Sequence, residues 1–222
     1  MRKRDRFADE ESPNFWPAVA DAFIGFLALV LIAGLAAFAD ATAKGQEPPP
    51  AKQDFQKEFE MAFAHTQGVG VEAHARPEVK NEGFSELKIY FPAKFLFLPC
   101  HVDLMTPAAT ELNNLKTLFQ RHRSQILRVQ ITGHTDTDRP GHDCYKQGIK
   151  TNWELSARRA ITVAELLAPD DKDKSGLDPH IVWPTARGEY EPVDKGLGPE
   201  AKARNRRIEI LVRFEEADSK KQ

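Results

Sequence analysis

The sequence predicts an α+β fold, with a mixed sheet and helices on one of its faces, preceded by a single transmembrane helix. Three observations support this. Residues 15–39 form an almost continuous apolar run, and the chain from residue 86 onward alternates strand-like and helix-like patterns. The composition, 41% hydrophobic and 29% charged residues, is sufficient for a packed core. A net charge of −2 argues against a protein whose main task is to coat nucleic acid.

The apolar run at residues 15–39 exceeds the ~20 residues that cross a ~30 Å hydrocarbon core. Four bases precede it: Arg2, Lys3, Arg4 and Arg6. One lysine lies between the run and Pro50, so the excess of bases predicts that residues 1–14 are cytoplasmic and that the rest of the chain lies across the membrane. The alternative is a cleaved signal peptide ending near Ala43, and the length of the apolar core argues against it.

Asp21 lies inside this run. A carboxylate at the centre of a membrane helix costs about 2.5–3.5 kcal/mol on insertion scales, so such a residue usually faces a partner helix or water and marks an ion path. A carboxyl group that alternates between water and a dry site can take up and release a proton. The alternative is that Asp21 lies at the cytoplasmic interface and remains hydrated.

Residues 40–85 are expected to form a linker. Pro48–Pro50 cannot continue a helix and are typical of a stiff spacer. Within residues 53–65, Phe55, Phe59 and Phe63 recur at helical spacing, which predicts a short amphipathic helix. This helix is expected either to dock on the main domain or to act as a gate. Residues 67–85 are expected to be irregular.

Residues 86–215 carry the pattern of the main domain, and residues 216–222 form a polar tail. Strands are expected at 87–91, 127–131, 181–186 and 208–214, and a turn at 133–136. Helices are expected from Thr106, with Thr106 as the cap and Pro107 in the first position, and over 152–167. Strand–helix–strand–helix–strand–strand corresponds to a layered α+β domain with helices on one face.

Two sets of residues resemble known families. The segment FWPAVADAF at 15–23 is similar to the start of the membrane helix in MotB-type subunits, which implies that Asp21 matches their ion-carrying aspartate. Four blocks, ITGHTDT, NWELSARRAITVAELL, ARGEYEP and ARNRRIEILV, resemble the OmpA-like peptidoglycan-binding domain in order. In MotB-like proteins a short amphipathic helix after the membrane segment can plug the channel, which is the gate expected of residues 53–65.

The OmpA-like resemblance implies a site for the diaminopimelate of peptidoglycan stem peptides. Its residues match Asp136, Asn152, Leu155 and Arg159. Diaminopimelate offers a carboxylate and an ammonium on one carbon, which an arginine and an aspartate suit. The alternative is an ordinary ion pair between Asp136 and Arg159 that closes the loop. Arg204, Arg206 and Arg207 are expected to flank the last strand and the cell-wall groove.

The loop at residues 137–151 is longer than is usual in that family and is expected to overhang the site. It contains Cys144, and Cys100 lies in the opening loop of the domain. Beyond the inner membrane thiols meet an oxidising compartment, so a Cys100–Cys144 disulfide is expected. A zinc site formed by both cysteines with His101 and His142 is the alternative, although this spacing is unusual for zinc.

A membrane helix with a buried acid, a spacer and a cell-wall anchor together resemble the B subunit of MotA/MotB-like stator units. In that family two B subunits sit in a ring of five A subunits at the bacterial inner membrane, with the C-terminal domain in the periplasm. The compact chain and enlarged loop resemble most closely the ZorB subunits of Zorya anti-phage systems, which implies a ZorA-like partner. The alternatives are a flagellar MotB subunit and a passive tether. We see no paired nucleophile and base, so neither an enzyme nor a cofactor is expected.

Overall fold

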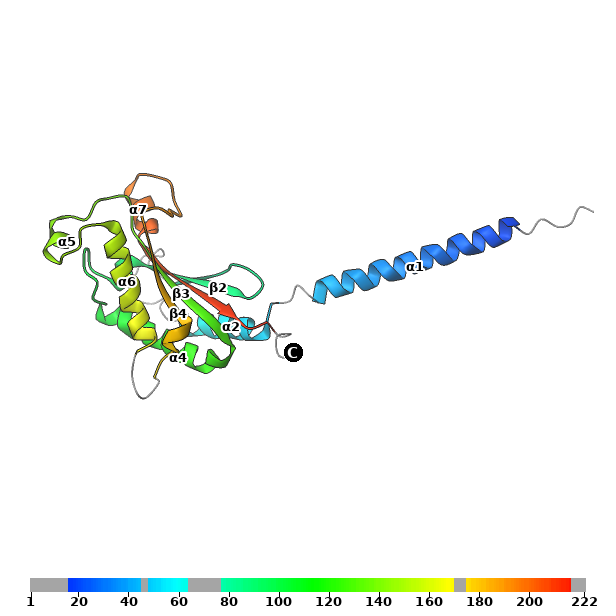
Figure 1. The fold of residues 1–222 in the computed structure, drawn as a ribbon, viewed down its shortest axis with the longest axis horizontal. Coiled ribbons are helices and arrows are strands. Elements are labelled where there is room, and N and C mark those ends of the chain that lie inside the picture. Colours follow the sequence, from blue (N-terminus) through cyan, green and yellow to red (C-terminus); the bar gives the residue numbers. More distant parts are fainter. Residues whose placement is uncertain (1–15, 45–47, 64–76, 170–174, 217–222) are drawn as a thin grey trace, which may run out of the picture. The chain divides into compact units, whose positions relative to one another are not determined.

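The computed structural model describes residues 16–44, 48–63, 77–169 and 175–216, and the side chains of 16–22 and 40–44 are not described. The chain divides into two compact units, Met1–Glu47 and Pro48–Gln222. Figure 1 draws both units.

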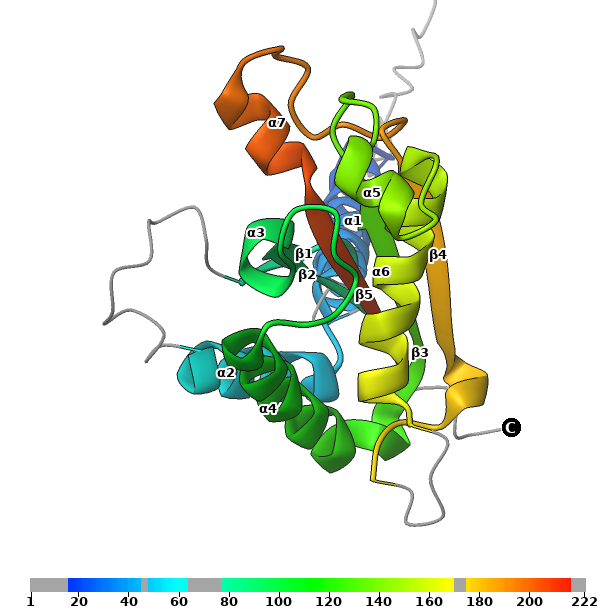
Figure 2. The same cartoon turned by 90° about the vertical axis from the view of Figure 1, so that its left-hand side faces the viewer.

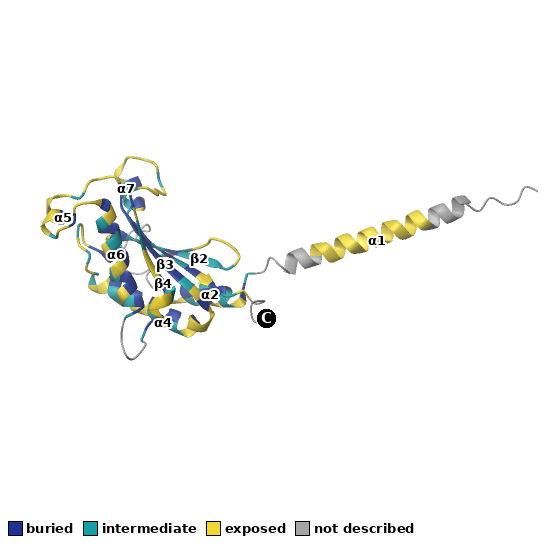
Figure 3. Ribbon diagram, in the orientation of Figure 1, coloured by how far each residue is buried: buried dark blue, intermediate teal, exposed yellow. Residues whose placement is uncertain are grey.

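The first unit contains one long helix, α1 (Trp16–Lys44). Its described side chains, at residues 23–39, are apolar apart from its glycines and exposed along the helix (Figure 3). Among the residues that the structure describes, we find no helix with both the length and the apolar character needed to cross a membrane. Asp21 belongs to α1, but its side chain lies outside the described residues.

The second unit is built on a five-stranded sheet in the order β1-β2-β5-β3-β4. The strands are β1 (Glu78–Asn81), β2 (Glu86–Pro92), β3 (Ile126–His134), β4 (Val182–Gly188) and β5 (Arg207–Phe214). β3 and β4 are parallel, and the other neighbours are antiparallel, so the sheet is mixed. The chain reaches β4 from β3 through a helix, as a parallel pair requires.

Three helices cover one face of this sheet: α2 (Pro50–Phe63), α4 (Thr106–His122) and α6 (Asn152–Leu167) (Figure 2). Every second residue of β2 and β5 points into the core between the sheet and these helices, for example Ile89 and Ile210. Short helices complete the fold: α3 (Ala93–Leu96), η3 (Arg123–Gln125), α5 (His142–Lys146), η4 (Pro179–Ile181) and α7 (Pro199–Asn205).

The amphipathic helix expected in the linker is α2, and it docks on the main domain. Phe55 is fully buried, and its ring lies 5.5 Å from that of Phe119 and 5.4 Å from that of Phe214. Lys52 is also buried and donates hydrogen bonds to the carbonyl oxygens of Gly83 and Phe84. Burial lowers the pKa of Lys52, although Glu86 acts in the opposite direction.

The strands and helices expected from the periodicity are confirmed, with three differences. Thr106 is not the cap of α4: it is the first helical residue, and Met105 stands at the cap with no side-chain hydrogen bond. β3 continues through His134 because it pairs with β5 on one side and β4 on the other, so the turn begins only at Thr135. β1 lies where irregular chain was expected, because pairing with β2 orders a segment of weak strand propensity.

Candidate ligand-binding site

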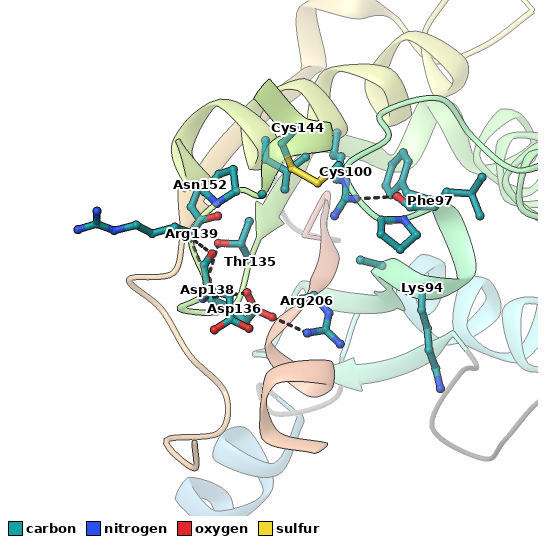
Figure 4. A pocket seen from close by; sticks show the side chains of 17 residues that line it. Lys94, Phe97, Cys100, Thr135, Asp136, Asp138, Arg139, Cys144, Asn152 and Arg206 are labelled. Atoms are coloured by element: carbon teal, nitrogen blue, oxygen red, sulfur yellow. Dashed lines mark hydrogen bonds and ion pairs between the residues drawn. A yellow bond between two sulfur atoms is a disulfide. The ribbon is translucent and has the colours of Figure 1, made fainter. Parts of the chain in front are cut away.

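A cavity of about 410 Å³ opens at the end of the sheet where β3 ends and β5 begins (Figure 4). Residues from four parts of the chain line it: α3 and the loop after it, the loop after β3, the start of α6, and the residue before β5. Its polar members include Asp136, Asp138, Asn152, Arg159 and Arg206. Arg139 also lines the cavity, but its side chain points away from the centre in Figure 4.

Asp136 lies at the base of this cavity and is only 7% exposed. Its Oδ1 accepts the backbone N–H of Asp138 at 3.1 Å, a local bond that stabilises the turn. Its Oδ2 accepts a hydrogen bond from Nη1 of Arg206, and the two side chains face each other in Figure 4. The buried carboxylate is therefore paired and oriented by neighbouring residues of the chain.

Three other elements fix the loop that carries Asp136. The amide of Asn152, at the start of α6, donates to the carbonyl oxygens of Asp136 and Asp138 at 3.2 and 3.0 Å. The N–H of Thr135 donates to the carbonyl of Gly188, at the end of β4, at 2.8 Å. Lys202 of α7 donates to the carboxylate of Asp138 at 2.6 Å. The loop is held by contacts far apart in the sequence, which suits a preorganised site.

The position of α6 depends on a capped start and on one glycine. Thr151 and Glu154 form a capping box, in which each side chain accepts a backbone N–H of the other residue. A Cβ atom at Gly133 would lie 2.1 Å from the carbonyl oxygen of Ser156, so only glycine allows α6 to approach the end of β3 this closely. This approach brings the start of α6 to the loop of Asp136.

Arg159 reaches across the cavity from α6 to its opposite wall. It is 5% exposed, and it donates from Nε to the carbonyl of His101 at 3.0 Å and from Nη2 to that of Leu98 at 3.1 Å. Its guanidinium lies 4.9 Å from the ring centroid of Phe97. Its pKa is lowered to about 10, first by burial and then by the neighbouring charge of Arg206, while Asp136 acts in the opposite direction. The two arginines and the aspartate thus act on one another electrostatically.

The outer wall is the long loop after β3, which a disulfide holds against the loop after α3. Cys100 and Cys144 are bonded, with Cα atoms 4.8 Å apart. Cys144, Ile149 and Leu155 form a small apolar cluster of their own. The two sulfur atoms are therefore bonded to each other and packed against this cluster. The carbonyl groups of Leu98 and His101, which accept hydrogen bonds from Arg159, lie on either side of Cys100 in the sequence.

The four residues expected at the site, Asp136, Asn152, Leu155 and Arg159, all line this one cavity. Arg159 does not form the ion pair with Asp136 that the alternative interpretation required, because its donors engage backbone carbonyls and Arg206 takes that place. The sequence predicts only that Arg206 flanks the groove. The register that pairs His134 with Arg207 brings Arg206 beside the loop of Asp136, and strand pairing is not visible in a single sequence.

The comparison with family models gives a match to the OmpA family over residues 96–206, which is half of the 222 residues. The chain belongs to the OmpA family. Of the charged residues that line the cavity, all except Lys94 lie within the matched residues. The mixed sheet and helices described above are thus the fold of an OmpA-like domain.

Two of the individual proteins that the chain resembles are MotB or MotB-like proteins. Motility protein B of Bacillus subtilis (strain 168) is 30% identical over 106 residues, which cover 48% of this chain and 36% of that protein. The match thus spans about a third of that curated relative. The crystal structure of a MotB-like protein from Desulfovibrio vulgaris superposes with a TM-score of 0.60 at 28% identity, covering 76% of this chain and 94% of the other.

A third comparison concerns the fold alone. The cell wall anchor of the type VI secretion system from Pseudomonas aeruginosa superposes with a TM-score of 0.56 at 24% identity, covering 71% of this chain and 95% of that one. The OmpA-like architecture therefore recurs in proteins with different names and assemblies.

Proposed function

We propose that the cavity binds the stem peptide of peptidoglycan and that the chain is the B subunit of a MotB-like stator unit anchored to the cell wall. The observation that carries the proposal is a buried acid, Asp136, that is paired with Arg206 and interacts electrostatically with Arg159, in a preformed cavity of an OmpA-family domain. Similarity to a MotB-like structure at 28% identity supports the stator assignment.

The chemistry of the cavity matches an amino acid with both charges on one carbon. Asp136 receives the ammonium group of diaminopimelate, which replaces Arg206 as its partner. Arg206, whose side chain is 40% exposed, then pairs with the carboxylate of diaminopimelate. The positive charge of the buried Arg159 also attracts this carboxylate. Asn152 keeps Asp136 in place, and Leu155 packs against the methylene chain. A ligand with only one of the two charges leaves a buried ion unpaired, which is costly.

Co-sedimentation of the detergent-solubilised full chain with purified cell-wall sacculi tests the anchor. We expect Asp136→Asn and Arg206→Ala to weaken binding by at least about tenfold, because each removes a charged hydrogen-bond partner. The control is Arg123→Ala, an exposed arginine in η3 outside the cavity, which should bind as the wild type does. Unchanged binding by both cavity variants would contradict the anchor.

The proposal for the first unit rests on the sequence. Residues 15–39 form the single membrane helix, with the N-terminus in the cytoplasm and the domain in the periplasm. Asp21 carries ions past a ring of MotA-like A subunits, and the B subunit acts as a pair within five A subunits. One elementary charge crossing 100 mV delivers about 2.3 kcal/mol, which sets the work available per ion.

We further propose that this stator unit serves anti-phage defence of the Zorya type, with a ZorA-like A subunit. The enlarged, disulfide-held loop and the short spacer support this assignment. The alternative is flagellar motility, which the similarity to Motility protein B favours.

Phage plating efficiency on cells that express the operon encoding this chain tests both the role in defence and the ion path through Asp21. Wild type, Asp21→Asn and Asp136→Asn are compared at equal membrane levels. Protection by the wild type alone is the expected result. Protection by Asp21→Asn would make the chain a passive tether. A wild type that fails to protect but restores swimming to a stator-deleted host would assign it to motility.

A further inference from the structure

Two large aromatic side chains lie stacked on the surface outside the cavity. The rings of Trp153 and Tyr190 have centroids 5.3 Å apart and an interplanar angle of 24°. Trp153 is 46% exposed and Tyr190 is 63% exposed. Aromatic side chains usually bury their faces, so a stacked pair that leaves outer faces in water is a candidate contact surface.

The aromatic pair borders the cavity. Trp153 follows Asn152, which lines the cavity, and Tyr190 follows Glu189, whose carboxylate accepts a hydrogen bond from the Asn152 amide. The backbones also meet, because a Cβ atom at Gly188 would lie 3.5 Å from the nitrogen of Trp153. Figures 1 and 2 show the start of α6 and the end of β4 at the same end of the domain.

The pair is held on a rigid support. The hydroxyl of Ser156 donates to the carbonyl of Trp153 at 3.0 Å and accepts the N–H of Gly188 at 3.1 Å, so it joins the two backbone segments that carry the rings. The N–H of Tyr190 closes a turn onto the carbonyl of Arg187 at 3.2 Å. The stack is therefore fixed relative to Asp136, whose loop bonds to Gly188 through Thr135.

We propose that the Trp153–Tyr190 pair binds the glycan strand of peptidoglycan, beside the cavity that takes the stem peptide. The inference rests on the proposed function. Diaminopimelate is the third residue of the stem, so only two residues separate it from the sugar that bears the stem. When its head group occupies the cavity, that sugar therefore lies close to the cavity, and the aromatic pair borders the cavity.

The chemistry of the rim fits a sugar. One face of a pyranose ring presents C–H groups, which pack on the face of an indole or phenol ring, while its hydroxyls need polar partners at the edge. Such partners stand beside the pair: Tyr190 has its own hydroxyl, and Arg187 and Glu191 form an exposed ion pair at 3.0 Å. Two rings bordered by charges offer little apolar area, which suits a sugar better than a protein partner.

The test compares two soluble ligands on the detergent-solubilised full chain by calorimetry. One is the disaccharide-tripeptide released from sacculi by muramidase, and the other is the same tripeptide without sugar. The double variant W153A/Y190A should bind the disaccharide-tripeptide on the order of tenfold more weakly and bind the tripeptide as the wild type does. Trp183→Ala is the matched control. Trp183 is 50% exposed, as the paired rings are about half exposed, but it lies near the start of β4, whereas Tyr190 follows the end of that strand.

The outcomes separate this inference from the proposed function. Asp136→Asn should weaken binding of both ligands, whereas loss of the aromatic pair should affect the glycosylated ligand alone. If W153A/Y190A and wild type bind that ligand equally, or if the double variant loses affinity equally for both ligands, the aromatic pair does not bind the glycan. Either result leaves the proposal for the stem-peptide site intact. A wild type that binds neither ligand would overturn both proposals. The pair Trp153→Phe and Tyr190→Phe, which keeps aromatic faces, should retain most of the sugar-dependent affinity.

Discussion

The two ends of the sheet differ in what they bury. Where β3 begins and β5 ends, α2 and α4 contribute aromatic and aliphatic side chains, and Phe55 contacts Phe119 and Phe214. Where β3 ends and β5 begins, the buried residues include Asp136 and Arg159. One end contains apolar surface removed from water, whereas the other contains charges that need partners.

The difference separates stability from recognition. Burying an ion pair contributes little net stability, so the charged end depends on other devices, namely a disulfide, a glycine at a close approach and a capped helix. The apolar end needs none of these and supplies the core. We therefore expect the largest losses of folding stability from mutations at the apolar end, and smaller losses, with weaker binding where the cavity wall is altered, from mutations at the charged end.

The largest effect is expected at the apolar end. Phe55→Ala should lower the free energy of unfolding by about 3–5 kcal/mol, because it removes a fully buried ring from a close-packed cluster. Denaturant unfolding measures this, and sacculus binding below the transition should stay close to wild type. Met61→Ala, on the same helix but 66% exposed, is the control and should change stability by less than about 0.5 kcal/mol. A mild effect of Phe55→Ala would mean that α2 is not part of the folded domain in solution.

The second effect concerns the wall of the cavity. Replacing both Cys100 and Cys144 with serine should lower stability by about 2–4 kcal/mol, since the bond closes a loop across 44 positions. Binding should weaken as well, because the long loop after β3 loses its attachment to the opposite wall. Wild type treated with a reductant should behave like the double serine variant. Identical unfolding curves with and without reductant would argue against a structural role for the bond.

The third effect tests whether Arg159 and the disulfide hold the same loop. Arg159→Met keeps most of the buried stem and removes two donors, so it should cost about 1–3 kcal/mol. Combined with the serine pair, the losses should be non-additive by at least about 0.5 kcal/mol. Arg123→Met is the control, because Arg123 is exposed in η3, away from both loops, and its effect should add to that of the serine pair. Strict additivity would mean that the two features act on separate parts of the wall.

Much of this organisation is visible in the sequence, and the missing part has a physical reason. Local periodicity predicts β2, α4, β3, α6 and β5, because each of them buries one side. The positions of Asp136, Asn152, Leu155 and Arg159 follow from the motif blocks. The sequence does not show that Asp136 pairs with Arg206 rather than with Arg159. This pairing depends on the strand register that places Arg206 beside Asp136 and on the loop carbonyls that Arg159 reaches. β1 was missed because pairing with β2, rather than its own residues, makes it a strand.

The smallest effect is a pH dependence at the charged end. Glu209 on β5 accepts a hydrogen bond from Arg207 at 2.7 Å and lies 3.6 Å from a ring nitrogen of His134. Burial by itself raises the pKa of Glu209, but these two neighbours outweigh burial and hold it at about 2, below the ordinary 4.5. Since the folded-state pKa is lowered, the stabilisation is complete above about pH 4.5 and is lost as the pH falls toward 2.

Glu209→Gln should therefore remove stability at neutral pH and little of it near pH 2. We expect a difference from wild type of about 1–2 kcal/mol at pH 6 that shrinks on acidification, after allowance for solvent screening of a partly exposed pair. Denaturant unfolding across pH 2–6 measures the difference curve, which cancels the contributions of other carboxylates. Glu78→Gln, at an exposed position of β1, should give a flat difference. A flat curve for Glu209→Gln would mean that the pKa of Glu209 is not lowered in the folded state.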